Sequence, residues 1–227
     1  MRFATGSSPL GLYKELIRLH KEEGLDFSKV TTFNLDEYVG LPGDHPQSYR
    51  RFMNENLFNH INVPVQNTHV PSGTSANHVA SCEWYEKRIR DAGGIDIQVL
   101  GIGSDGHIAF NEPGSSLGSR TRMVTLTEQT LDDNARFFKN KADVPRHAIS
   151  MGVGTILEAR KLLMVANGKN KAAALAAAIE GPITSMITAS ALQLHPEAIV
   201  FADDDAAAGL KMRAYYDWIQ KQSKKAN

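Results

Sequence analysis

The chain has 227 residues, with 25 acidic and 25 basic side chains and a formal net charge of zero. This length predicts a single domain over residues 1–227, and the neutral balance gives no sign of binding to nucleic acid or to a membrane surface. The lone cysteine, Cys82, excludes an internal disulfide framework and is typical of a small buried residue. No apolar run approaches the roughly 18 residues of a membrane span, and no signal peptide opens the sequence, so we predict a cytoplasmic protein.

Helix and strand signals alternate along the chain. Ser8 as N-cap and Pro9 as first helical residue predict a helix that Gly24 ends, followed by a buried strand over 30–35. Further elements are predicted as helices within 48–61 and 75–93, strands at 95–103 and 161–168, a helix over 169–181, a strand at 198–203 and a final helix to about residue 220. This alternation predicts an α/β fold of three layers, a mainly parallel open sheet with helices on both faces.

The stretch 113–146 is less periodic and richer in polar residues than its flanks. A segment of this kind is typical of a loop with short elements that lies over a sheet edge. We therefore predict a lid-like insertion there.

The segment GIGSDGHIAFNEPGSSLGSRTR, residues 101–122, follows the predicted strand and carries three titratable side chains within eight positions. Asp105 and His107 are two residues apart and project to one side of an extended chain, Gly106 permits a tight bend, and Glu112 can reach the imidazole. Carboxylate partners stabilise a protonated histidine, which predicts an acid–base relay. Zinc would also accept these residue types, but no second histidine or cysteine stands at ligand spacing, so we predict no metal.

Asp36 and Glu37 stand at the end of the predicted strand 30–35. Successive side chains of a strand point to opposite faces, so only one of the two faces a site at the sheet edge. Partial desolvation there would raise the pKa of the carboxyl group and make it a general base. A helix cap or a salt bridge in a loop is the structural alternative.

Two segments suit a phosphate. Residues 5–9, TGSSP, place a glycine turn and hydroxyl groups at the amino end of a helix, where backbone N–H groups and the helix dipole attract anions. In Gly168-Lys169-Asn170-Lys171, two lysines stand near another helix start, which is unfavourable unless an anion binds. An ordinary capped helix and solvated lysines are the alternatives.

Three segments, ATGSSP, FNLDEYVGL and 101–122, resemble the hallmark segments of the glucosamine-6-phosphate deaminase family, and ARFF, ISMGVGTIL, GKNKA and LQLHP extend the similarity over nearly the whole chain. The resemblance implies a Rossmann-like, NagB-type fold. It also implies the conversion of glucosamine 6-phosphate and water into fructose 6-phosphate and ammonia, in amino-sugar catabolism, without a metal or organic cofactor. Relatives occur as monomers and as hexamers, so the oligomeric state stays open.

The resemblance assigns roles to individual residues. His107 opens the sugar ring, held by Asp105 and Glu112, and Asp36 moves a proton from C2 to C1. The implied phosphate ligands are Thr5, Gly6, Ser7, Ser8, Arg136 and Lys171.

The chain departs from the family pattern in two places. Only three residues precede ATGSSP, where relatives have a helix and a first strand, so we expect a central strand to be shortened or absent and the start to be incomplete. Members activated by N-acetylglucosamine 6-phosphate carry a lysine two positions after Arg122 and a tyrosine near the carboxyl end, where Val124 and Asp217 stand here. Ser115 and Arg122 remain as a remnant of that allosteric site, and we expect weak or no activation.

Two competing functions remain open. A 6-phosphogluconolactonase-like hydrolase would share the fold and the phosphate loop, but it needs no carboxylate base above C2, which FNLDEYVGL supplies. A catalytically inactive sugar-phosphate sensor would not need Asp36 together with Asp105, His107 and Glu112.

Overall fold

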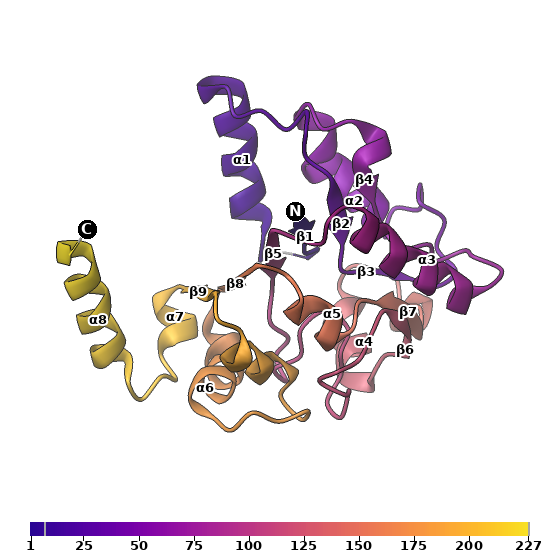
Figure 1. The fold of residues 1–227 in the computed structure, drawn as a ribbon. Helices are drawn as coiled ribbons and strands as arrows, with labels where there is room; N and C mark the ends of the chain where they lie inside the picture. The colour runs from indigo at the N-terminus through magenta and orange to yellow at the C-terminus, as the bar shows by residue number, and fades with distance from the viewer. Residues whose placement is uncertain (7, 227) are drawn as a thin grey trace.

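A computed structural model of the chain describes residues 1–6 and 8–226 (Figure 1). Its main sheet has six strands in the order β4-β2-β1-β5-β8-β9, and all its pairings are parallel. The strands are β1 (Arg2–Phe3), β2 (Thr32–Asn34), β4 (Thr68–His69), β5 (Ile97–Leu100), β8 (Lys161–Ala166) and β9 (Ala198–Ala202). The predicted parallel α/β sheet is confirmed.

The strand order reverses direction between β1 and β5. Taken as the first to sixth strands of this sheet, they stand in the order 3-2-1-4-5-6 of a doubly wound Rossmann fold. Ligands of such folds bind outside the carboxyl ends of the strands at this switch point. The expected short central strand is present as β1, which pairs with β2 and β5.

Helices cover both faces of the sheet, as predicted (Figure 1). Phe3 and Val99 pack with Tyr13 and Met53 of α1 and α2, whereas Leu100 belongs to the core formed with α3, α5 and α6. The helices are α1 (Leu10–Glu23), α2 (Tyr49–Asn56), α3 (His78–Asp91), α4 (Glu128–Ala135), α5 (Val153–Leu157), α6 (Ala172–Glu180), α7 (Asp204–Ala207) and α8 (Arg213–Ala226). Short 3-10 turns are η1 (Phe58–His60), η2 (Val65–Asn67), η3 (Lys141–Asp143), η4 (Lys169–Lys171) and η5 (Thr188–Leu194).

Helix boundaries differ from the sequence prediction at two ends of the chain. Pro9, and not Ser8, is the N-cap of α1, because its carbonyl accepts the first helical bond from the Tyr13 N–H, and no side chain caps this end. Gly24 ends α1 in the left-handed region at φ 75°, as predicted. The predicted final helix is two helices, α7 and α8.

A second, antiparallel sheet adjoins the first and was not predicted. It consists of β3 (Asp36–Tyr38), β7 (His147–Ser150) and β6 (Arg122–Thr125), in the order β3-β7-β6. Asp36, expected at the end of the strand 30–35, is therefore the first residue of a separate strand, β3. The segment 113–146 supplies β6, α4 and η3. Tyr38, Phe110, Leu126, Leu131, Val144 and Ala148 form a separate small core there.

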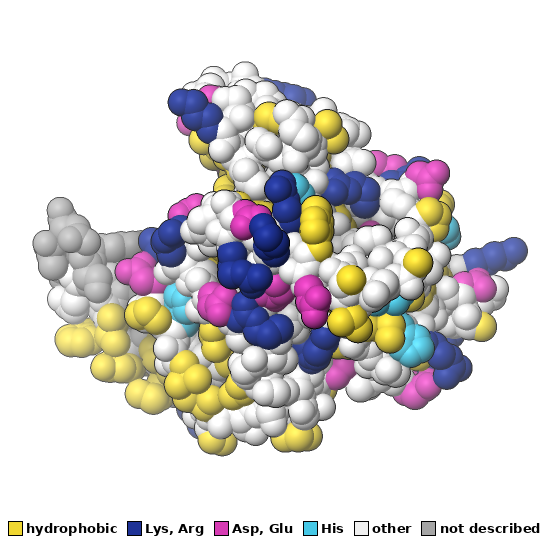
Figure 2. All heavy atoms as spheres, turned by 45° about the vertical axis from the view of Figure 1, so that its right-hand side comes forward, with side chains coloured by type: hydrophobic (Ala, Val, Ile, Leu, Met, Phe, Trp, Pro, Cys, Tyr) yellow, Lys and Arg dark blue, Asp and Glu magenta, His cyan; other side chains and the backbone are white. Residues whose placement is uncertain are grey.

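Charged side chains of both signs are interspersed on the face shown in Figure 2. That mixture agrees with the neutral composition of the chain. No helix in the described part of the chain is both long enough and apolar enough to cross a membrane.

Candidate active site

A cavity of about 680 Å³ opens at the switch point of the main sheet. Its walls come from the segments that follow four parallel strands, together with α4. Those segments contribute Thr5 after β1, Asp36 after β2, Gly103 and His107 after β5, and Lys171 after β8. The topology thus brings residues that are far apart in the sequence to one sheet edge.

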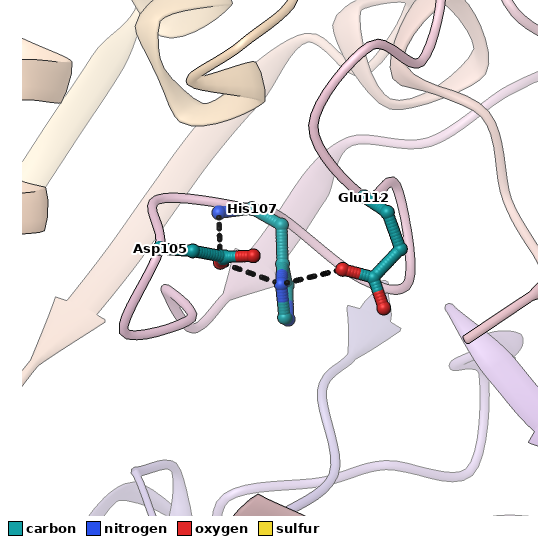
Figure 3. A group of neighbouring side chains, drawn as sticks. All are labelled: Asp105, His107 and Glu112. Carbon is teal, nitrogen blue, oxygen red and sulfur yellow. Dashed lines mark hydrogen bonds and ion pairs between the residues drawn. The ribbon is translucent and has the colours of Figure 1, made fainter. Parts of the chain in front are cut away.

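His107 is held between two carboxylates (Figure 3). Its Nδ1 lies 2.8 Å from Asp105 Oδ1 and 3.5 Å from Glu112 Oε2. Asp105 Oδ1 also accepts a hydrogen bond from the His107 backbone N–H at 3.1 Å. Because Nδ1 faces the carboxylates, Nε2 is the ring nitrogen left for a ligand in the cavity. The predicted grouping of these three side chains is confirmed.

Glycines shape the loop around this imidazole. Gly103 donates its N–H to the His107 carbonyl at 2.8 Å, and a Cβ added to Gly103 would stand 2.6 Å from His107 Cε1. Gly106 turns the chain at φ +88°, a conformation that side chains rarely adopt. The ring therefore rests on the backbone of the same loop that carries it.

The two carboxylates keep His107 charged near neutral pH. Burial disfavours the imidazolium, but the contacts with Asp105 and Glu112 outweigh burial and raise the pKa of His107 to about 9. Burial opposes ionisation of both carboxyl groups as well, yet the neighbouring imidazole holds the pKa of each below its ordinary value. The His107 imidazole, held between the two carboxylates, is therefore suited to donate a proton and to take it back.

Asp36 is buried against the same cavity, with 5% of its surface exposed. The Thr5 hydroxyl donates to its Oδ1 at 3.4 Å. Burial first and the charge of Glu37 second raise the pKa of Asp36 to about 7, while Thr5 and His107 act in the opposite direction. Burial and the raised pKa agree with the prediction for a desolvated carboxyl at this position, and its role as a base stays a prediction.

Glu37 points away from the cavity and caps helix α2. Its carboxylate accepts hydrogen bonds from Tyr38 N, Ser48 Oγ, Tyr49 N and Arg50 N at 2.6–3.1 Å. The expected alternation of the pair is confirmed, and the helix-cap alternative describes Glu37 and not Asp36.

Positively charged side chains also line the cavity. Of the predicted phosphate ligands, Thr5, Gly6, Ser8, Arg136 and Lys171 line the cavity, and Ser7 lies outside the described residues. Lys171 belongs to the turn η4, which precedes α6. Burial is the main cause that lowers the pKa of Lys171, Asp133 and Asp105 raise it, and Arg136 lowers it further.

Ser115 and Arg122 pair with one another outside the cavity wall. The Arg122 guanidinium donates to Ser115 Oγ at 3.2 Å and to Asn111 Oδ1 at 3.0 Å. Asn111 in turn donates to the carbonyls of Ile108 and Met151, so this pair is linked to the His107 loop.

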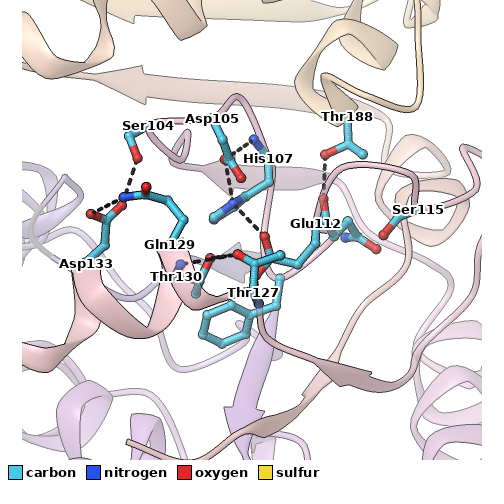
Figure 4. Close-up of polar contacts among 12 residues, drawn as sticks. Ser104, Asp105, His107, Glu112, Ser115, Thr127, Gln129, Thr130, Asp133 and Thr188 are labelled. Atoms are coloured by element: carbon cyan, nitrogen blue, oxygen red, sulfur yellow. Dashed lines mark hydrogen bonds and ion pairs between the residues drawn. The ribbon is translucent and has the colours of Figure 1, made fainter. Parts of the chain in front are cut away.

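Several cavity residues were missed by sequence reasoning. Tyr38, Tyr49, Phe110 and Phe138 form an aromatic wall that, in the sequence, is indistinguishable from core positions. Helix α4 also reaches the relay, because the Thr127 N–H donates to Glu112 Oε1 at 3.1 Å and Ser104 Oγ donates to Asp133 Oδ2 at 2.7 Å (Figure 4). The polar face of α4 was the available signal, but the partner loop could not be identified from it.

Asp105, His107 and Glu112 each offer one ligand atom within 4.8 Å of the others, a spacing that a metal ion could also use. The ion pairs of His107 employ the same groups without a metal. The prediction that no metal binds therefore stays open to a direct test.

Three comparisons relate this chain to known proteins. A family model for glucosamine-6-phosphate isomerases and 6-phosphogluconolactonase matches residues 2–201. The glucosamine-6-phosphate deaminase of Shewanella halifaxensis is 54% identical over 98% of this chain and 84% of its own length. That of Clostridium perfringens strain 13 is 54% identical over 92% of this chain and 86% of its own length.

Solved structures agree with the sequence relatives. A monomeric glucosamine-6-phosphate deaminase superposes with a TM-score of 0.90 and 46% identity, over 92% of this chain and 86% of that chain. A 6-phosphogluconolactonase from Thermotoga maritima superposes with a TM-score of 0.68 at 22% identity, over 88% of this chain and 83% of that chain. The second likeness shows the fold alone.

Proposed function

This chain belongs to the family of glucosamine-6-phosphate isomerases and 6-phosphogluconolactonases, and on that premise we propose that it is a glucosamine-6-phosphate deaminase. It converts glucosamine 6-phosphate and water into fructose 6-phosphate and ammonia, in amino-sugar catabolism. The observation that carries the proposal is the pair of Asp36 and His107 on one cavity wall, one a buried carboxyl with a pKa of about 7 and the other an imidazole with a pKa of about 9.

The two groups divide the reaction between them. His107, oriented by Asp105 and Glu112, donates a proton to the ring oxygen and then takes up the proton of the C1 hydroxyl, so that the ring opens to the aldehyde and the imidazolium is restored. Asp36 then removes the proton from C2 while His107 protonates the oxygen at C1, which forms an enolamine. Asp36 returns its proton at C1, which forms a ketimine whose surplus proton goes back to His107. Water adds to C2 of the ketimine and ammonia leaves. General acid–base transfer of this kind contributes typically 10²–10⁴-fold to a rate, most when the pKa lies near the working pH.

The phosphate binds at the positive end of the cavity. The turn with Thr5, Gly6 and Ser8 offers backbone N–H groups next to the start of α1, and Arg136 and Lys171 supply charge-assisted contacts. Ser7 is proposed as a ligand from the sequence alone. This anchor leaves the carbon chain to extend toward Asp36 and His107.

A lactonase is the second candidate, since it shares the family and the fold. The buried Asp36 favours the deaminase, because proton transfer between C2 and C1 needs a base poised near neutral pH, whereas lactone hydrolysis does not. The named relatives at 54% identity are also deaminases.

The setting of the enzyme follows from the substrate. We place it in the cytoplasm, acting on a small sugar phosphate without a nucleic-acid or membrane partner, and its state as a monomer or hexamer is open to size measurement. The segment 113–146 is proposed as a lid, because its helix α4 lines the cavity.

An assay coupled to both products tests the function. Purified protein with glucosamine 6-phosphate is expected to release ammonia and fructose 6-phosphate in equal amounts. The same protein with 6-phosphogluconolactone should show no hydrolysis above the spontaneous rate. Lactone cleavage without ammonia release would overturn the proposal.

A further inference from the structure

Helix α4 is tied to the His107 loop along one of its faces (Figure 4). At its start, Glu112 Oε1 accepts the Thr127 N–H at 3.1 Å, and the Thr130 side chain also stabilises the Glu112 carboxylate. One turn later, Asp133 Oδ2 accepts the Ser104 hydroxyl at 2.7 Å. Residues three apart are neighbours on the surface of a helix. The contacts of Thr127, Thr130 and Asp133 with the loop therefore follow one another along the helix.

The end of the same helix carries part of the positive cavity wall. Arg136 is the C-cap residue of α4, three positions after Asp133, and it lines the cavity with Lys171. The charges of Asp133 and Arg136 both reach Lys171, where they act on its pKa in opposite directions. Asp133 is therefore an acidic residue placed among the groups that attract a phosphate.

A helix of eight residues moves as one unit, because hydrogen bonds join each turn to the next. A dianion attracted by Arg136 and repelled by Asp133 acts on the helix that also holds Glu112. Binding energy from a part of the substrate that does not react can in this way align the groups that do.

We propose that helix α4 couples the phosphate end of the cavity to the His107 relay, and that Asp133 is the positioning residue that fastens the helix to the loop through Ser104. The inference rests on the proposed function, because it requires a phosphorylated substrate. It assigns to Asp133 a role that differs from binding the substrate.

Four variants separate this role from a general effect on the surface. Asp133→Ala and Ser104→Ala each remove the contact, and we expect either to lower kcat by about three- to tenfold. Asp133→Asn keeps an acceptor for Ser104 but loses the charge, so kcat should stay within about twofold of the parent while inorganic phosphate inhibits about two- to threefold more strongly. Asp132→Ala is the control, because Asp132 pairs with Lys141 instead, and it should change neither value.

The double variant sharpens the result. Removing both Ser104 and Asp133 side chains should cost no more than Asp133→Ala alone, because both changes remove the contact between Ser104 and Asp133. Asp133→Ala also removes the hydrogen bond that Gln129 Nε2 donates to Asp133 at 3.1 Å, which Ser104→Ala keeps. Multiplying losses would overturn the proposal, as would an Asp133→Ala variant that matches the Asp132→Ala control. Thermal unfolding of each variant shows whether a lower kcat comes from instability of the fold. If Asp133→Ala is unstable, the kcat of Ser104→Ala, which changes only the loop side of the contact, tests the proposal instead.

A spectroscopic measurement tests the coupling without turnover. The ring signal of His107, identified by its loss in His107→Gln, should move when inorganic phosphate is added to the parent protein and to Asp133→Asn. In Asp133→Ala the movement at saturation should fall to about half or less, and an unchanged movement would overturn the coupling. A parent protein that releases no ammonia would refute the proposed function instead, and the histidine signal would still decide the role of Asp133.

Discussion

Two buried carboxyl groups of this chain behave in opposite ways. Asp36 at the start of β3 and Glu86 in α3 have nearly the same exposure, 5% and 6%. Glu86 accepts hydrogen bonds from Thr121 and Thr155 and forms an ion pair with Arg120. Burial would raise the pKa of Glu86, but these contacts outweigh burial and lower it. Within residues 1–6 and 8–226, the hydrogen bond to the Asp36 carboxylate comes from Thr5, and the pKa of Asp36 rises to about 7.

Burial alone therefore does not turn a carboxyl group into a base. A buried carboxylate that accepts several hydrogen bonds stays ionised and joins two parts of the structure. A buried carboxylate with few hydrogen-bond donors has a raised pKa and can take up a proton. Glu86 fastens α3 to the segment before β6, and its charge is fully satisfied. Asp36 is left with a single long contact on a cavity wall, where a substrate proton can compete.

The largest effect is expected at Asp36. Asp36→Asn removes the base and should lower the rate of ammonia release by about 10²–10⁴-fold, with the fold retained. The coupled assay measures the rate, and circular dichroism checks the fold. Equal turnover in the variant and the parent would exclude Asp36 from the mechanism.

Glu86 should show the reverse pattern. Glu86→Gln leaves threonine donors and Arg120 without their charged partner, and we expect the free energy of unfolding to fall by about 2–3 kcal/mol while kcat of the folded protein is kept. Denaturant titration measures the loss. Glu158→Gln is the matched control, because Glu158 also contacts Arg120 but its side chain is 60% exposed, and it should change stability by less than about 0.5 kcal/mol. A kcat loss as large as that of Asp36→Asn would contradict the contrast.

Ionisation of Asp36 should cost stability. Its folded pKa, about 7, lies above the ordinary 3.8, so the folded state holds a proton in that window that the unfolded state has released. The free energy of unfolding must then fall as pH rises from about 4 to 7. Asp36→Asn has no carboxyl group to ionise at this position. Its free energy of unfolding, measured by denaturant titration, should therefore rise relative to that of the parent as the pH rises from about 4 to 7. A stability difference that does not change with pH would show that Asp36 is not desolvated as described.

A smaller effect is expected when the one described donor to Asp36 is removed. The rate should rise with pH near 7 as Asp36 ionises and fall near 9 as His107 loses its proton. Thr5→Val removes a hydrogen bond to the ionised carboxylate, so the acidic limb should move to higher pH while the alkaline limb stays in place. Thr5→Ser keeps the hydroxyl and is the control. Identical acidic limbs in all three proteins would mean that the contact has no influence.

No effect at all is expected from removing metals. Asp105, His107 and Glu112 form ion pairs with one another, so dialysis against a chelator should leave kcat unchanged. Loss of activity that zinc restores would show that the three atoms within 4.8 Å hold a metal ion instead.

The site illustrates how far sequence reasoning reaches. Asp105, His107 and Glu112 stand within eight positions, so local geometry sufficed to bring them together. The opposite directions of Asp36 and Glu37 followed from strand alternation, which depends only on neighbouring residues. The antiparallel sheet was missed because β3 and β6 are only three and four residues long and pair through β7, which is distant in sequence.

The alternation of helices and strands, the relay loop and the types of residue available for acid–base chemistry could be predicted from the sequence, because these depend on contacts a few residues apart. The tertiary structure decided the rest. It placed the phosphate loop, Asp36, His107 and Lys171 at one switch point, and it determined which buried carboxyl was supplied with donors and which was not. The strand end suggested a desolvated carboxyl, but how many donors reach it and which distant segments pair with it depend on the whole chain, so these were visible only in the tertiary structure.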